Sequence, residues 1–539
     1  MHKTSPMTTL QINNDKKPLS LWQSPICVAL SAMLFVVTIP QLTYAKNEST
    51  KNHSIKSKSV KTDNKTIYHT LNNGLKVIIQ PDHRAPLVMV QVWYQVGGAD
   101  EPDDLLGISH VLEHMMFRGT VKVPDDQFKR INANFGGSLN ALTNHNYTYY
   151  YQLFPKDYVA LALELEADRM SNLHLRQQDF ATEIEVVKEE RRQRIEDNPQ
   201  AQAFEDFRQI AYPSSRYRLP VIGYMQNLNH IKLADVRKWY QTWYAPNNAT
   251  LVIVGDVNPK QTLTQVQRFF GDIKSKQLPE RNRLKESNQS GYRHEVKYAS
   301  VHVQNLYMAW NVPSLATASP KNQAYVLDVL REVLDGGLSA RIEKELVREQ
   351  KILTTASANY EMLNRGDTIF SITAIPAEGV TLNQAEQAII KLIDELKTSR
   401  IQPDELLRVQ SSTLSKMVYA QDTLQGQAEL IGKMQANNVD ANEAKNLYQK
   451  YDNIKAEDLQ QVITQYFNDD NLASLYLLPM DQQPVFTQNQ TQGQIQNQTQ
   501  NLTQQQSQNQ VKQTLQNQQN NDVVNTAKTQ NTTTQSLKN

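Results

Sequence analysis

The sequence has almost no cysteine: Cys27 is the one such residue among 539. A disulfide-stabilised scaffold and a zinc site built from thiolates are therefore excluded. Charge of one sign is lacking too, because 56 Lys and Arg and 55 Asp and Glu leave a formal net charge of +1. Without a broad electrostatic field to attract a polyanion, we expect no nucleic-acid partner.

Long apolar runs are also missing. The apolar stretch at about 26–39 is shorter than the ~20 residues that a membrane-spanning helix usually needs. It follows Lys16 and Lys17 and precedes Thr43-Tyr44-Ala45, which is the order of parts in a secretory signal, so we predict a signal peptide over 1–45. The chain is then exported, to the periplasm of a Gram-negative bacterium, with no membrane span after cleavage. The alternative is an uncleaved signal that anchors the chain in the inner membrane.

Two further segments have little apolar content. Residues 46–65 are rich in Lys, Ser, Thr and Asn, and we predict a mobile lead-in there. In residues 487–539 about half of the side chains are Gln or Asn, and none is aromatic. Such a segment cannot bury enough apolar surface to offset the entropy lost on ordering, so we predict a disordered tail.

What remains is long enough for two folded domains. Residues 274–294 are mostly polar and include Pro279 and Gly291, so we interpret them as a linker. The flanking stretches, 66–273 and 295–486, have similar lengths and a similar order of strand, helix and turn. We interpret them as two related αβ domains, argued from pattern alone.

Apolar patterns and turn residues predict the main elements. Strands are expected at 75–79, 87–96, 250–254, 301–312 and 367–375. Helices are expected from Asp103 or Asp104 to just before Gly119, and at 157–173, 179–196, 321–334 and 339–349.

Metal-binding chemistry is concentrated at residues 110–114, His-Val-Leu-Glu-His. His110 and His114 are four residues apart, so both imidazoles project from one face of a helix. Neutral imidazoles suit zinc, and a catalytic zinc needs three protein ligands and an open position for water. Glu113 lies on the same side, where it can accept a proton from that water, in an inverted zinc motif. The plain alternative is a solvated helix face, so the motif requires a third ligand.

The acidic stretch 183–190, Glu-Ile-Glu-Val-Val-Lys-Glu-Glu, offers that ligand. Glu183 and Glu190 are seven residues apart, close to two helical turns, so they share a face. By itself such a stretch is typical of a solvated charged surface.

The combination of motif and acidic stretch resembles the pitrilysin/insulinase family of inverzincin peptidases, since Glu190 follows His114 by 190 − 114 = 76 residues. Residues 137–143 (Gly-Ser-Leu-Asn-Ala-Leu-Thr) and 217–223 (Tyr-Arg-Leu-Pro-Val-Ile-Gly) are also similar to family sequence, as are 246–248 (Pro-Asn-Asn) and 254–256 (Val-Gly-Asp). The resemblance covers roughly 66–480 and is strongest over 70–256.

The resemblance implies a complete catalytic site. His110, His114 and Glu190 would bind one Zn²⁺ per chain. Glu113 would be the general base, and Glu183 would support the ligand set without binding the metal. Asn140 and Ala141 would contact the backbone of the substrate.

The resemblance also implies the architecture and the partners. The chain is similar to the two-domain subgroup that includes bacterial homologues of the mitochondrial processing peptidase. We therefore expect an α+β fold of two homologous αβ domains, each a mostly antiparallel sheet packed by helices, forming half of a clamshell. The expected activity is that of a zinc-dependent endopeptidase, which hydrolyses extended peptides or unfolded polypeptides in the closed chamber of a dimer.

One departure from the family pattern bears on that activity. Many active relatives have an Arg and, seven residues on, a Tyr that hold the substrate; here Arg348 is kept, but Thr355 replaces the tyrosine. We therefore expect a dimer in which a second chain, identical or non-identical, supplies the missing group. The competing hypotheses are a surface role for Arg348, and a catalytically idle structural or assembly subunit of the same fold.

Overall fold

The computed structural model describes residues 65–483, apart from 126, 282–285, 287–290, 441–442 and 444–446. The predicted signal peptide and tail lie outside the described residues, as do Cys27, the lead-in apart from Lys65, and part of the predicted linker. All described residues belong to one compact unit of the chain. In this described part, no helix is both long and apolar enough to cross a membrane.

The first sheet has six strands in the order β1-β2-β6-β3-β5-β4. They are β1 (Ile67–Thr70), β2 (Lys76–Pro81), β3 (Leu87–Tyr94), β4 (Ser138–Thr143), β5 (Thr148–Pro155) and β6 (Ala249–Gly255). β2 and β6 pair in parallel, and the other neighbours pair antiparallel. Every residue of β6 is buried, because this central strand is covered on both faces and its sequence is continuously apolar from Leu251 to Val254.

The second sheet repeats this topology. Its strands are β7 (Arg293–Ala299), β8 (Asn305–Val312), β9 (Leu353–Tyr360), β10 (Thr368–Pro376) and β11 (Leu472–Pro479), in the order β7-β11-β8-β10-β9. That order matches β2-β6-β3-β5-β4, including the single parallel pair, here β7 with β11. The predicted α+β fold of two mostly antiparallel sheets packed by helices is confirmed.

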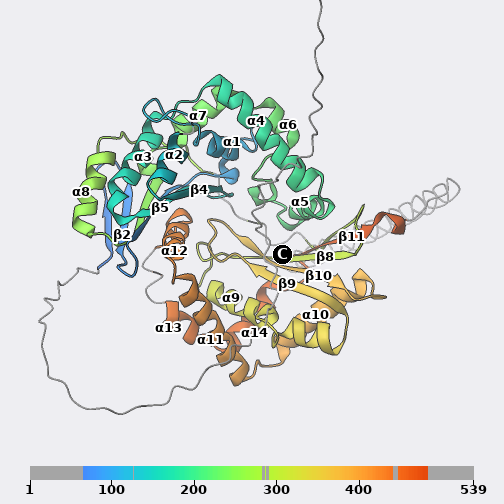
Figure 1. Cartoon of the computed structure of the whole chain (residues 1–539). Coiled ribbons are helices and arrows are strands. Elements are labelled where there is room, and N and C mark those ends of the chain that lie inside the picture. Colours follow the sequence, from blue (N-terminus) through green and yellow to red (C-terminus); the bar gives the residue numbers. More distant parts are fainter. Residues whose placement is uncertain are drawn as a thin grey trace, which may run out of the picture. The chain divides into compact units, whose positions relative to one another are not determined.

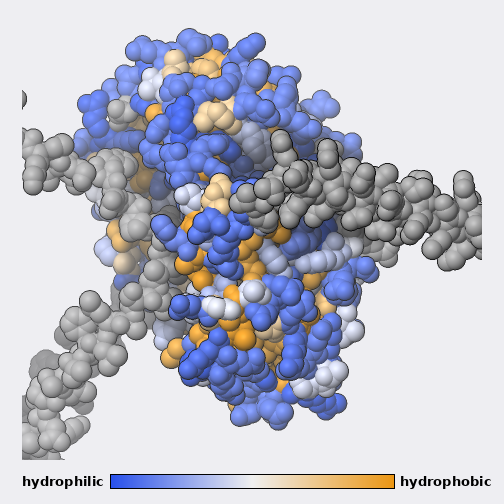
Figure 2. All heavy atoms as spheres, turned by 90° about the vertical axis from the view of Figure 1, so that its right-hand side faces the viewer, coloured by the Kyte–Doolittle hydropathy of each residue, from blue (hydrophilic) through white to orange (hydrophobic). Residues whose placement is uncertain are grey.

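Helices cover each sheet. In the first half they are α1 (Ile108–Met115), α2 (Gln127–Asn134), α3 (Val159–Asn172), α4 (Gln177–Arg191), the π-helix η3 (Arg192–Glu196), α5 (Pro199–Ala211), α6 (Met225–His230), α7 (Leu233–Trp243) and α8 (Pro259–Phe270). In the second half they are α9 (Asn322–Asp335), the π-helix η6 (Ile342–Glu349), α10 (Leu382–Thr398), α11 (Pro403–Ala420), α12 (Leu424–Ala436), α13 (Leu447–Asp452) and α14 (Ala456–Tyr466). The face shown in Figure 2 is mostly hydrophilic, with hydrophobic side chains gathered toward its middle.

Each half also contributes one helix to the sheet of the other half. α12 packs against β3 and β6 of the first sheet, and Ala428 and Ile431 share a buried cluster with Trp93. In return α5 packs against β11, β7 and β8 of the second sheet and lies beside β8 and β11 in Figure 1. Phe207 of α5 is buried among residues of that sheet. The two apolar cores are therefore completed reciprocally.

The helix that carries the histidine motif is shorter than predicted. α1 begins at Ile108, not at Asp103 or Asp104. Gly107 precedes it with φ 94°, and a Cβ there would lie 2.6 Å from the carbonyl oxygen of Ile222. The close backbone approach of residues 222–223 thus requires glycine and sets the start of the helix.

Candidate metal centre

The buried face of α1 orients its chemistry. Ile108, Val111, Leu112 and Met115 point into the core of the first sheet, so the motif residues occupy the opposite, partly open side. The start of the helix is held by the buried carboxylate of Glu101, which accepts hydrogen bonds from the backbone N–H groups of Gly107 (2.7 Å) and Ser109 (2.8 Å). A carboxylate suits this place because the first N–H groups of a helix have no partner within it.

α4 brings the third donor to α1. Phe180, Ile184 and Val187 are buried on α4, and Glu183 and Glu190 of this helix are directed at α1. Oε2 of Glu190 lies 3.4 Å from Nε2 of His114 and 3.7 Å from Nε2 of His110. We call these three residues the His-His-Glu cluster, whose donor atoms all lie within 4.8 Å of one another.

The distances from Glu190 Oε2 to the two imidazole nitrogens are close to those expected between zinc ligands. Ligands about 2.0–2.2 Å from a tetrahedral ion lie roughly 3.3–3.6 Å apart. The side chain of His110 is 12% exposed, and its Nδ1 is buried without a hydrogen-bond partner. Burial lowers the pKa of His110 to about 4, so its imidazole is in the neutral form that binds metal.

His114 is oriented by a chain of hydrogen bonds between charged groups, through Glu183 to Arg118. Glu183 Oε2 lies 3.0 Å from Nδ1 of His114, and Glu183 Oε1 accepts from Nε of Arg118 at 2.7 Å. Burial would lower the pKa of His114, but the hydrogen bonds to Glu183 and Glu190 raise it to about 9. With Nδ1 directed at Glu183, Nε2 faces Glu190, and it is the nitrogen that can bind a metal once its proton is lost.

The carboxylate of Glu113 lies between the cluster and β4. Thr143 of β4 donates from Oγ1 to Glu113 Oε2 at 2.6 Å. Burial raises the pKa of Glu113. The arrangement holds a carboxylate beside the cluster, at the place where a general base would act.

β4 is an edge strand, so one side of its backbone is unpaired within the sheet. Its side chains alternate: Asn140 and Leu142 are exposed, while Ala141 packs against the core below α1. The side chain of Asn140 accepts a hydrogen bond from the backbone N–H of Ala141 at 2.9 Å. Both predicted substrate contacts therefore lie on the free edge next to Thr143.

The structure does not bring the second-half residues into this site. Arg348, in η6, donates to the carbonyl oxygen of Leu338 and lies 3.7 Å from Glu343. Thr355 is exposed in β9, the edge strand of the second sheet. Neither residue has a hydrogen bond or ion pair with the cluster.

Several site residues were not predicted from the sequence. Arg118 follows His114 by four residues, and Arg194, whose guanidinium lies 2.7 Å from Glu190 Oε1, follows Glu190 by four. Burial would raise the pKa of Glu190, but His114 and the other cations around it lower it to about 2. The four-residue spacing is a signal that could have found both arginines, whereas Glu101 and Thr143 are recognisable only in the fold.

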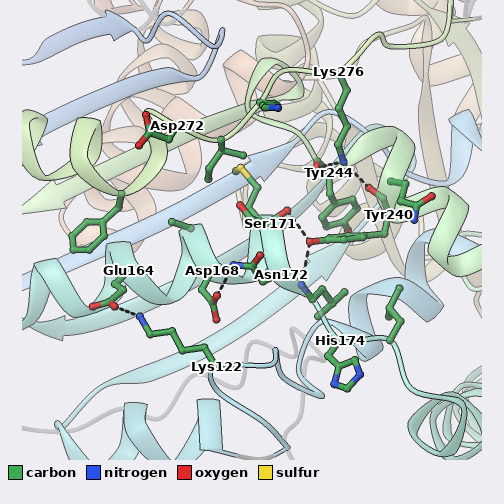
Figure 3. Close-up of a pocket in the computed structure, with 18 of the residues that line it drawn as sticks. Lys122, Glu164, Asp168, Ser171, Asn172, His174, Tyr240, Tyr244, Asp272 and Lys276 are labelled. Atoms are coloured by element: carbon green, nitrogen blue, oxygen red, sulfur yellow. Dashed lines mark hydrogen bonds and ion pairs between the residues drawn. The ribbon is translucent and has the colours of Figure 1, made fainter.

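A larger cavity than the one beside α1 lies between α3, α7 and α8 (Figure 3). It has a volume of about 900 Å³ and contains none of the cluster residues. Two of its charged groups are paired within it: Lys122 pairs with Glu164, and Lys276 donates to the carbonyl oxygen of Tyr244 at 2.9 Å.

Two domain families match the chain. The Insulinase (Peptidase family M16) domain matches residues 76–223, which contain the whole site, and the Peptidase M16 inactive domain matches residues 230–413. The zinc protease PqqE of Helicobacter pylori is 29% identical over 418 residues, 76% of this chain and 92% of that protein. The mitochondrial-processing peptidase subunit beta of Dictyostelium discoideum is 29% identical over 245 residues, 43% of this chain and 50% of that protein.

A solved structure agrees with these matches. The crystal structure of a protease from Helicobacter pylori is 28% identical, with a TM-score of 0.72 over 77% of this chain and 100% of that chain. The inverted histidine motif, the two repeated sheets and the two matching domains lead to one conclusion: the chain belongs to the pitrilysin/insulinase family, peptidase family M16.

Proposed function

We propose that the chain is a zinc-dependent endopeptidase that binds one zinc ion through His110, His114 and Glu190. The observation that carries this proposal is the His-His-Glu cluster, three metal-binding side chains whose donor atoms lie within 4.8 Å of one another, next to the carboxylate of Glu113. Relatives named zinc proteases support it. Zinc bound at such a site polarises a carbonyl group and lowers the pKa of water toward ~7.

The residues around the cluster have separate roles in proton transfer and in orienting the ligands. Glu113 takes the proton of the attacking water and passes it to the leaving amine. Thr143 holds Glu113 in position by its 2.6 Å hydrogen bond. Glu183 and Arg118 orient His114 so that its lone pair faces the metal position.

The substrate is an extended peptide or unfolded polypeptide that lies along the free edge of β4. Backbone pairing with an edge strand demands little of the peptide sequence. Asn140 and Ala141, on this edge, supply backbone contacts. Arg348 holds the substrate only if a second chain or a domain movement brings it to a cluster.

The proposal includes assembly and location. A dimer, with an identical or a non-identical chain, forms the closed chamber, as supported by the relative named as subunit beta of a processing peptidase. Residues 1–45 direct export to the periplasm before they are removed, as supported by their basic start, short apolar stretch and small residues at the end. The segments 66–273, 274–294 and 295–486 are the peptidase domain, the linker and the second domain.

Glu113→Gln tests the catalytic role directly. Cleavage of an unstructured peptide is expected to fall by a factor of ~10² to 10⁴, because a general base contributes about that much. Zinc content, measured by elemental analysis of the purified chain, is expected to stay at that of the wild type. Retained cleavage would refute Glu113 as the base. Zinc-loaded wild-type chain that cleaves nothing, alone or with a co-purified partner, would favour the idle-subunit hypothesis.

A further inference from the structure

A cavity of about 320 Å³ opens beside the His-His-Glu cluster, with His110 and Thr143 in its wall. This volume is at the lower end of the range for small-ligand sites, about 300–1,000 Å³. Phe204 and Val221 contribute apolar walls. A peptide whose scissile carbonyl reaches the cluster must direct a flanking side chain past this opening.

Two guanidinium groups in this cavity have no carboxylate partner. Arg208 donates to the carbonyl oxygen of Tyr217, and Arg218 donates to that of Pro213 at 3.3 Å. No carboxylate oxygen of the described residues lies within 4.0 Å of either group. Burial lowers the pKa of Arg208, which means that the site disfavours its cation until an anion arrives. A half-buried cation without a counter-ion therefore favours an anionic ligand.

The other charged groups of the cavity are already paired. Both carboxylate oxygens of Glu205 accept from Arg191, at 3.0 and 3.1 Å. Arg194 is paired with Glu190 at 2.7 Å. The single acid of the wall, Glu205, is thus hydrogen-bonded to an arginine outside the wall, and it acts on Arg208 only through space, without an ion pair.

His145, in the wall of the cavity, does not serve as a hydrogen-bond acceptor for these arginines either. Nε2 of His145 lies 2.8 Å from the carbonyl oxygen of Leu219 and 3.2 Å from Nη2 of Arg208. The carbonyl oxygen can only accept, so the Nε2 proton is directed at Leu219, and Nε2 then has no lone pair to accept from Arg208. Burial, followed by the charge of Arg208, lowers the pKa of His145 to about 3. His145 is therefore a neutral wall that leaves the guanidinium of Arg208 available.

We propose that this cavity selects an acidic substrate residue. A glutamate at one of the two positions that flank the scissile bond pairs its carboxylate with Arg208 and Arg218, while its methylene groups pack against Phe204 and Val221. Hydrogen bonds between two charged groups are about twice as strong as neutral ones, and the planar guanidinium matches a carboxylate in shape. This inference rests on the proposed peptidase function and names the class of its substrates.

Paired peptides test the selection. Unstructured peptides that differ only in Glu or Gln at each flanking position are incubated with the zinc-loaded full chain, and the cleaved bonds are assigned by mass spectrometry. The Glu peptide is expected to have a kcat/KM about ten times that of the Gln peptide at one position, because a hydrogen bond to a charged group contributes at least that factor. Arg208→Gln and Arg218→Gln are expected to bring the ratio toward one.

A control variant and the ratio of the two rates distinguish substrate selection by Arg208 from a purely structural role. Arg192, in η3, is exposed and paired with Glu189, so Arg192→Gln is expected to keep the wild-type ratio. If Arg208 only supports the backbone at Tyr217, its removal slows both peptides equally and the ratio is kept, which overturns its role in selection. Arg208→Lys keeps the charge and is expected to keep part of the preference.

Peptide binding gives a readout that needs no catalysis. Fluorescence anisotropy of the same peptides with the Glu113→Gln chain is expected to show about tenfold tighter binding of the Glu peptide, lost when Arg208→Gln is added. A Glu-to-Gln ratio near one in cleavage and in binding would overturn the inference and leave the proposed function standing. Failure of the zinc-loaded wild type to cleave any peptide would overturn the proposed function. The ratio of Glu-peptide to Gln-peptide binding would then still test whether the cavity prefers an acidic residue.

Discussion

The two sheets have the same strand order, yet the helix that follows the matching strand differs in character. After β3 comes α1, eight residues long, with His110, Glu113 and His114 on its open side. After β8 comes α9, fourteen residues long, of which ten are buried. In the described part of the chain, the His-His-Glu cluster is the one group of three metal-binding residues. One topology therefore supports packing in one half and chemistry in the other.

The comparison also shows that the halves are not independent. α12 leaves the second half to cover the first sheet, and α5 leaves the first half to cover the second sheet. At Gly432 the approach is so close that a Cβ would lie 2.0 Å from the ring of Trp93. Stability of the catalytic half thus depends on the half without a metal cluster, and the reverse.

Breaking the contact of α5 tests this dependence with the largest expected effect. Phe207 is 1% exposed and lies 5.8 Å from the ring of Tyr307 in the second sheet. Phe207→Ala is expected to lower the free energy of unfolding by about 3–5 kcal/mol, measured by urea denaturation, since a large buried ring leaves a cavity. Phe204→Ala, on the same helix but 39% exposed, is the control with a smaller loss. Equal losses would contradict the role of α5 as a cover.

A substitution of Glu183, which hydrogen-bonds to His114, tests whether zinc binding depends on this local contact. Glu183→Gln is expected to weaken zinc binding by about 10–100-fold, measured by competition with a chelator, because the hydrogen-bond partner that orients the histidine is weakened. Glu386, buried in the second half and hydrogen-bonded to Tyr292 and Tyr476, is the matched glutamate. Glu386→Gln is expected to leave zinc affinity unchanged, and an equal effect of both variants would refute the local role of Glu183.

The smallest expected effect is that of His145 on the loss of stability at acid pH. The pKa of His145 is about 3 in the folded state, against about 6.5 in an unfolded chain, because it is desolvated next to Arg208. Its contribution is fully present above pH ~6.5 and is lost as pH falls toward ~3, since only the unfolded state takes up the proton there. His145→Gln is expected to reduce the drop in melting temperature between pH 7 and pH 5 by roughly 2–4 °C. An unchanged drop would contradict a neutral His145.

The strongest local patterns predicted the fold well. β3 and β6 are strands rich in apolar residues, and α3 and α4 begin and end within a few residues of the predicted helices. β7 and β9 were not predicted, because these edge strands are half exposed and mix polar with apolar residues. β5 and β11 were not predicted either, although most of their residues are buried. The exchange of α5 and α12 was also not predicted, since an amphipathic face does not specify which sheet it will cover.

For the site, the sequence by itself determined the chemical types and their local geometry. Spacings of four and seven residues within single helices place His110 with His114 and Glu183 with Glu190, because the helical repeat is set by the backbone alone. Only the tertiary structure decided that these two helices meet, that Thr143 reaches Glu113, and that Glu101 caps α1. It also left Arg208 and Arg218 without acidic partners beside the cluster. Such contacts join residues far apart in the chain, so they follow from how the apolar faces pack and not from any local spacing.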